Sequence, residues 1–156
     1  MMKKLFVVFV FLMISMIGYS QSTKEINDLY HKSLDYYYEQ EYDSARVGFE
    51  NLVEIDSINS NYNYFLGLCH FFEADYNFAI YFLEKSTEDV RLTNNIKNQI
   101  YSPHSIYFYI AFSYEKMKKY DKAIENYKIY KDYEIDGMVI TNTEKRIKQI
   151  EENYDK

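Results

Sequence analysis

The sequence repeats one short pattern at three places: Glu41-Tyr42-Asp43-Ser44-Ala45, Asp75-Tyr76-Asn77-Phe78-Ala79 and Lys119-Tyr120-Asp121-Lys122-Ala123. Each copy consists of a charged residue, a tyrosine, an Asp or Asn, any residue and an alanine. The first two alanines are 34 residues apart, and the third follows after 44, which is 34 plus an insertion of ten. Each copy lies between two stretches in which apolar residues have helical spacing. We therefore expect each copy to join the two helices of a hairpin.

Seven helices follow from the apolar spacing and from the capping and breaking residues. Four glycines and one proline in 156 residues are too few turn residues for an all-β sandwich or barrel. A capping box at Ser22 and Glu25 precedes the first helix, and Ser102-Pro103 is typical of a helix start. The pattern predicts an all-α chain. Its helices run from the capping box to residue 38 and then over about residues 43–55, 60–72, 77–90, 102–117, 121–133 (with Gly137 ending that unit) and 142–153.

The period and the repeated residues resemble the tetratricopeptide repeat family. With each constant alanine counted as position 20, the units cover residues 26–59, 60–93 and 104–137, with an insertion near residues 87–103. Every unit has a small residue at position 8, a tyrosine at 17 and a large residue at 24: Ser33, Gly67 and Ala111; Tyr42, Tyr76 and Tyr120; Phe49, Leu83 and Tyr127. The Trp common at position 4 and the Pro common at 32 are missing. The resemblance implies an α-solenoid of three helical hairpins over residues 21–138, with residues 139–156 as a C-terminal capping helix.

The small residue at position 8 has a physical purpose in such a hairpin. We expect it to let the two helices approach each other closely at the alanine of position 20, while the aromatic residues fill the space around the crossing. One hairpin cannot bury both of its apolar faces, so neighbouring hairpins stack. The last helix carries Ile147, Ile150 and Tyr154 on one side and charged residues on the other, which is typical of a terminal cap.

The N-terminus has the layout of a secretory signal peptide. Lys3 and Lys4 precede the almost wholly apolar residues 5–17, and Gly18-Tyr19-Ser20 supplies the small residues of a cleavage site. The alternative is an uncleaved membrane anchor. Thirteen helical residues rise only about 20 Å, short of a hydrocarbon core of about 30 Å. We therefore predict cleavage near Ser20/Gln21 and export to the periplasm or the extracellular space, so that the chain meets a membrane only through this transient segment.

The charge balance argues against nucleic acid as a partner. The formal net charge is −6, and it becomes −8 when the two lysines of residues 1–20 are removed. Binding to nucleic acid or to anionic lipid needs a basic stripe or patch. Cys69 is the single cysteine and lies in an apolar stretch, so an intrachain disulfide is impossible and the thiol is expected to be a small core residue.

The sequence shows no catalytic constellation. His31, His70 and His104 are scattered, without the spacing of a metal site or a catalytic group, and His70 stands where an aromatic residue packs between helices. The sequence offers no convincing pair of catalytic carboxylates, no calcium loop and no glycine-rich phosphate loop, and Glu151, Glu152 and Asp155 have the pattern of a solvated terminus. We therefore expect no enzymatic activity, no cofactor and no metal.

In the family that the chain resembles, positions 2, 5, 9, 12 and 13 of each first helix line the inner groove. In this chain those positions are rich in aromatic residues, which favour protein recognition. We expect packing between hairpins to account for about half of them, Leu68 and Phe72 most of all. The predicted contacts with a protein or peptide partner are Asn27, Tyr30, Tyr37, Asn61, Tyr64, Phe71 and Phe108.

Two functions remain open at this stage. The first is a non-catalytic exported module that binds a peptide or a partner protein in the concave groove. The second is a structural subunit of a cell-envelope assembly, held by its convex face or by the insertion. Replacing Tyr64 by alanine tests whether the groove exists. If Tyr64 lines the groove, the substitution should weaken binding and leave the thermal midpoint nearly unchanged. If Tyr64 belongs to the core, the midpoint should fall.

Overall fold

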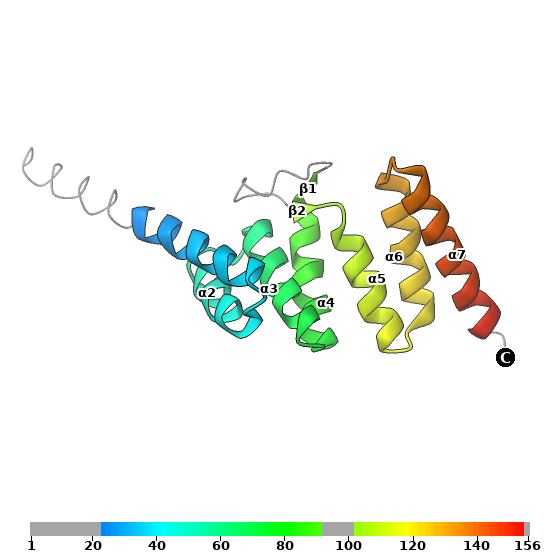
Figure 1. The fold of residues 1–156 in the computed structure, drawn as a ribbon, viewed down its shortest axis with the longest axis horizontal. Coiled ribbons are helices and arrows are strands. Elements are labelled where there is room, and N and C mark those ends of the chain that lie inside the picture. Colours follow the sequence, from blue (N-terminus) through cyan, green and yellow to red (C-terminus); the bar gives the residue numbers. More distant parts are fainter. Residues whose placement is uncertain (1–22, 92–101, 155–156) are drawn as a thin grey trace, which may run out of the picture.

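The computed structural model describes residues 23–91 and 102–154, which form a row of helices (Figure 1). The first helix covers residues 23–38. The other helices are α2 (Tyr42–Ile55), α3 (Ser60–Phe72), α4 (Tyr76–Lys85), α5 (Ile106–Lys116), α6 (Tyr120–Tyr133) and α7 (Gly137–Tyr154). The first helix pairs with α2, α3 with α4 and α5 with α6, and α7 covers the end of the row. The predicted all-α solenoid is confirmed. The predicted signal peptide, residues 1–20, lies outside the described residues.

The turn inside each hairpin has the same backbone geometry. Gln40, Ala74 and Lys118 have φ values of 64°, 61° and 59°, in the left-handed region that a non-glycine residue rarely adopts. In each turn the next backbone N–H donates to a carbonyl five residues earlier, for example from Asp75 to His70 at 2.9 Å. This bond satisfies one of the last carbonyls of the first helix. The three turns are 34 and 44 residues apart, the spacing of the repeated pattern in the sequence.

The segment between α4 and α5 differs from the prediction. Helix α4 ends at Lys85 and not near Val90, because the side chains of Ser86 and Thr87 donate to the carbonyls of Leu83 and Glu84 and the chain continues as a 3₁₀ turn (Ser86–Asp89). Strand β1 (Val90–Arg91) then pairs in parallel with β2 (Ser102–Pro103). The prediction that Ser102-Pro103 starts a helix is therefore wrong. The pairing draws these residues into a short ladder, and α5 begins at Ile106.

The last helix also begins earlier than predicted. The sequence pattern placed its start near Asn142 and took Gly137 as the end of the preceding unit. In the structure the Asp136 carboxylate accepts from the backbone N–H groups of Met138 and Val139, at 2.8 and 3.3 Å. This cap allows the helix to start at Gly137. No helix within residues 23–91 and 102–154 is long and apolar enough to cross a membrane.

The core follows the repeat. All three constant alanines, Ala45, Ala79 and Ala123, are completely buried. The two helices of the second hairpin also approach each other closely at Gly67. A Cβ added to Gly67 would lie 2.7 Å from Leu83 Cγ and 3.0 Å from the Leu83 backbone nitrogen. In this hairpin position 8 therefore packs against position 24, one helical turn beyond the alanine of position 20. Helix α3 is the central element, since every residue from Ser60 to His70 is buried.

Replacing Ala79 by leucine is expected to destabilise the fold by about 1–3 kcal/mol, because three more carbon atoms have no space at a completely buried position. Urea unfolding measures the effect. The control is Asn77→Leu, which adds a leucine to an exposed position of the same helix. If the two variants lost equal stability, burial of the repeat alanine would not be the cause.

Candidate functional site

Three of the seven predicted contact residues are buried inside the protein. Tyr30, Asn61 and Tyr64 are 0%, 1% and 5% exposed. The Tyr30 hydroxyl donates to Asn61 Oδ1 at 2.8 Å, and the Tyr64 hydroxyl lies 3.4 Å from Ser105 Oγ. Burial raises the pKa of both tyrosines, so both stay neutral and available for these bonds. The prediction that these three residues line an open groove is wrong.

The hydrogen bonds of these buried residues repeat along the chain. Tyr30 and Tyr64 are position 5 of units one and two, and their partners Asn61 and Ser105 are position 2 of units two and three. The first helix is thereby joined to α3, and α3 to the residue that precedes α5. The pattern stops at Phe108, which is position 5 of unit three and has no hydroxyl. These positions therefore contribute to stacking of the hairpins.

The other four predicted residues remain accessible to different degrees. Asn27 is exposed on the first helix, and Tyr37, Phe71 and Phe108 are half-buried. The structure brings the three aromatic residues into one continuous surface. We call this surface the aromatic band and define it by its half-buried or exposed rings: Tyr37, Tyr38, Tyr42, Phe71, Phe72, Phe108, Tyr109, Phe112 and Tyr130.

Ring contacts connect the aromatic band across all three hairpins. Tyr37 of the first helix lies 6.1 Å from Phe72 of α3, measured between ring centroids. Phe71 of α3 lies 5.0 and 5.5 Å from Tyr109 and Phe112 of α5. Phe108 continues the band to Tyr130 of α6 at 5.6 Å. The band therefore lies mainly on the first helices of the hairpins, which line the groove in the family that the sequence resembles, with Tyr42 and Tyr130 added from second helices.

Two residues of the band, Tyr38 and Phe72, are exposed. Tyr38 is 58% exposed and Phe72 is 42% exposed. Phe72 contacts rings of both neighbouring hairpins, as expected, and still keeps part of its surface accessible. Leu68, for which we made the same prediction, is indeed buried. Phe72 stacks on Tyr42 at 4.6 Å, with 12° between the ring planes. This leaves one edge of the pair open to a partner, and exposed aromatic rings of this kind are typical anchors at protein interfaces.

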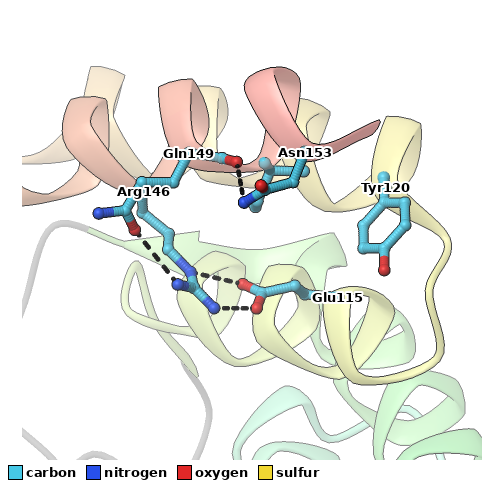
Figure 2. Close-up of a pocket in the computed structure, with 6 residues that line it drawn as sticks. Glu115, Tyr120, Arg146, Gln149 and Asn153 are labelled. Atoms are coloured by element: carbon cyan, nitrogen blue, oxygen red, sulfur yellow. Dashed lines mark hydrogen bonds and ion pairs between the residues drawn. The ribbon is translucent and has the colours of Figure 1, made fainter. Parts of the chain in front are cut away.

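A polar pocket of about 420 Å³ lies between α5, α6 and α7 (Figure 2). The Glu115 carboxylate accepts from the Arg146 guanidinium and, at 3.0 Å, from the Tyr127 hydroxyl. The bonds with Glu115 raise the pKa of Arg146. Glu115 was a position of the expected inner face. In the structure it attaches the terminal helix α7 to the third hairpin, so the pocket belongs to the capping contact.

Two of the nucleophilic and basic candidates, Cys69 and His70, are packed in the interior, whereas His31 is exposed and His104 is half-buried. Burial raises the pKa of the Cys69 thiol to about 12, so the thiol stays protonated and unreactive at neutral pH. His70 stacks on Phe82 with 9° between the ring planes, and burial lowers its pKa. Among residues 23–91 and 102–154, no three His, Cys, Asp or Glu side chains gather as a metal site.

Known structures share this arrangement of helices, although no protein-family profile and no curated protein matches the sequence. The type III secretion translocator chaperone SycD of Yersinia enterocolitica is 16% identical, with a TM-score of 0.67 over 84% of this chain and 86% of SycD. PcrH, solved with the chaperone binding region of PopD, is 14% identical, with a TM-score of 0.67 over 84% and 94%. The tetratricopeptide repeat domain of Arabidopsis OM64 is 13% identical, with a TM-score of 0.64 over 81% and 96%. The chain therefore has the tetratricopeptide repeat fold that its repeats predicted.

Proposed function

We propose that this chain, which has the tetratricopeptide repeat fold, is an exported and non-catalytic module that binds a segment of a partner protein on the aromatic band. The observation that carries the proposal is the continuous run of half-buried and exposed rings across three hairpins, with Tyr38 and Phe72 the most exposed. A surface of this kind is costly to leave in water, and rigid aromatic side chains bind a partner at low entropy cost. Structural neighbours support the proposal, since PcrH was solved with a segment of PopD.

A photo-crosslinking amino acid at position 72 tests the proposal in cells, with the same group at position 78 as the matched control. Phe78 is 54% exposed and lies on α4, the second helix of its hairpin. We expect a discrete crosslinked partner from position 72 and none from position 78. Crosslinks from position 78 alone would contradict the proposal.

Replacing Phe72 by alanine is expected to weaken binding of that partner about thirtyfold, equivalent to roughly 2 kcal/mol, because a central aromatic anchor is lost. The thermal midpoint should change little, since the ring is 42% exposed. Phe78→Ala is the matched control and should leave the affinity unchanged. An equal loss of affinity in both variants would show that the contact is not specific to the aromatic band.

A second candidate function is a structural subunit of a cell-envelope assembly. Phe78 and Tyr81 of α4 are both 54% exposed, which gives the second helices an apolar surface as well. A permanent contact there would predict a stoichiometric complex in envelope extracts that Phe78→Ala disrupts and Phe72→Ala does not. The longer aromatic band favours the first function.

The export part of the proposal rests on the N-terminal pattern of two lysines, an apolar run and Gly18-Tyr19-Ser20. Purified protein from the native host is expected to begin at Gln21, because cleavage follows the small residue at Ser20. N-terminal sequencing measures this directly. A protein that begins at Met1 would contradict export and would leave the binding proposal unaffected.

A further inference from the structure

The charges beside the aromatic band change sign from one end of the row to the other. The turns of the first two hairpins, residues 39–45 and 73–75, contain five carboxylates and no lysine or arginine: Glu39, Glu41, Asp43, Glu73 and Asp75. The turn of the third hairpin, residues 116–122, contains four lysines and one carboxylate: Lys116, Lys118, Lys119, Lys122 and Asp121. These residues are exposed. The turns of the second and third hairpins follow one edge of the row (Figure 1).

The acidic turns form a pocket that is joined to the aromatic band. The pocket measures about 390 Å³ and is lined by Gln40, Glu41, Tyr42, Asp43, Ser44 and Glu73. Tyr42, one of these residues, stacks on Phe72 at 4.6 Å, so the pocket opens beside the most exposed ring of α3. A side chain that follows the band can therefore reach the carboxylates.

The carboxylates of this pocket outnumber the cation that neutralises them. Arg46 forms ion pairs with two of them, Asp43 and Glu73, at 3.4 and 3.2 Å, and with Glu50 beside the pocket at 2.8 Å. Burial and a hydrogen bond with Asp43 raise the pKa of Glu73, as is expected where carboxylates crowd together. A second cation from a partner would relieve this repulsion.

The opposite end of the band carries ammonium groups. Lys116 Nζ lies 4.9 Å from the ring centroid of Phe112, which in turn contacts Phe71 at 5.5 Å. Lys119 and Lys122 lie over Tyr114, at 5.9 and 5.1 Å. Lys116 thus connects the basic turn to the aromatic band by a direct contact, as Tyr42 connects the acidic pocket. Tyr114 is buried outside the band, and its hydroxyl donates to Glu84 of α4.

We propose that the partner is an extended peptide segment with charges of opposite sign at its two ends. Its lysine or arginine enters the acidic pocket, apolar side chains cover the aromatic band, and an aspartate or glutamate lies against the lysines of the third hairpin. This inference rests on the proposed function and adds the chemistry and the direction of the ligand. Complementary charges at the two ends would fix that direction, because the reversed segment would bring like charges together.

Selection from a random peptide library displayed on phage tests the inference on the purified full chain. Peptides of about 12 residues suffice, since they extend to roughly 40 Å. We expect the selected peptides to combine Lys or Arg near one terminus, Asp or Glu near the other, and aromatic or aliphatic residues between them. The affinity of a selected synthetic peptide is then measured by fluorescence anisotropy.

Charge reversals with matched controls identify the two ends. Glu41→Lys is expected to weaken the selected peptide about tenfold, whereas Glu54→Lys, the same change at the far end of α2, should have little effect. Lys116→Glu is likewise expected to weaken the selected peptide about tenfold, whereas its control, Lys128→Glu, should have little effect. A peptide whose basic residue is replaced by Glu should regain affinity for the Glu41→Lys variant.

The outcomes separate the inference from the proposed function. Selected peptides without opposite end charges, or equal effects of Glu41→Lys and Glu54→Lys, would overturn the inference. If Phe72→Ala still abolished binding in that case, the proposed function would stand. If the selected peptides bound the Phe72→Ala variant as tightly as the wild type, or if no peptide were enriched, both the inference and the proposed function would be overturned.

Discussion

Replacing Tyr64 by alanine will lower the thermal midpoint by roughly 10 °C. Tyr64 is 5% exposed on the central helix α3, and its ring lies 5.2 Å from that of Phe65. Removing a buried aromatic ring leaves a cavity and costs about 3–5 kcal/mol. For a chain of this size each kcal/mol lowers the midpoint by about 3 °C. Circular dichroism melts measure the change, and any loss of partner binding should follow from unfolding.

The Tyr64→Phe variant separates the ring from its hydroxyl. The hydroxyl lies 3.4 Å from Ser105 Oγ, at the long end of hydrogen bonding, so its loss should cost about 1 kcal/mol or less. A Tyr64→Ala protein that melts like the wild type but no longer binds its partner would contradict the buried position. It would restore Tyr64 to the binding surface that the sequence suggested.

The fold was predictable because its main features depend on local spacing. Apolar periodicity and the repeated turn pattern determine the number and order of the helices, and the three buried alanines follow from the register. The errors lie where a tertiary contact overrides a local signal. Ser102-Pro103 has the residues of a helix start, but pairing with Val90-Arg91 places it in a ladder that no local pattern shows.

The binding surface was only partly predictable because helix position alone does not determine exposure. Positions 2 and 5 were assigned to the groove by resemblance to the family. In this chain they carry Tyr30, Asn61 and Tyr64, whose size and hydrogen bonds place them between neighbouring first helices. A tyrosine at position 5 facing an amide or hydroxyl at position 2 of the next unit was a signal in the sequence. It could have identified these residues as stacking contacts.

The residues that were missed lie at the hairpin turns. Tyr42 was noted only as the constant tyrosine of the repeat, and Phe72 was expected to pack. Their stacking contact joins the end of α3 to the start of α2, 30 residues apart in the chain. Only the packing of the first hairpin against the second brings the two rings together, so their exposure could not be derived from either segment alone.

Replacing Gly67 by valine is expected to cost about 3 kcal/mol or more. Helix propensity argues weakly the other way, because glycine is the poorest helix former after proline. Packing decides the sign in this case. The first added carbon would lie 2.7 Å from Leu83 Cγ and 3.0 Å from the Leu83 backbone nitrogen. A side-chain rotation cannot move a backbone atom, so α4 itself must shift from α3 and disturb the central hairpin.

Gly137→Val is the matched control, because it adds the same atoms to a glycine with no neighbour within 4 Å of the added Cβ. It is the exposed first residue of α7, so its effect should be within about 0.5 kcal/mol. Urea unfolding of both variants compares the same chemical change with and without a close neighbour. If Gly67→Val were as stable as Gly137→Val, α3 and α4 could separate without cost, and the close approach at position 8 would not be what fixes the geometry of the central hairpin.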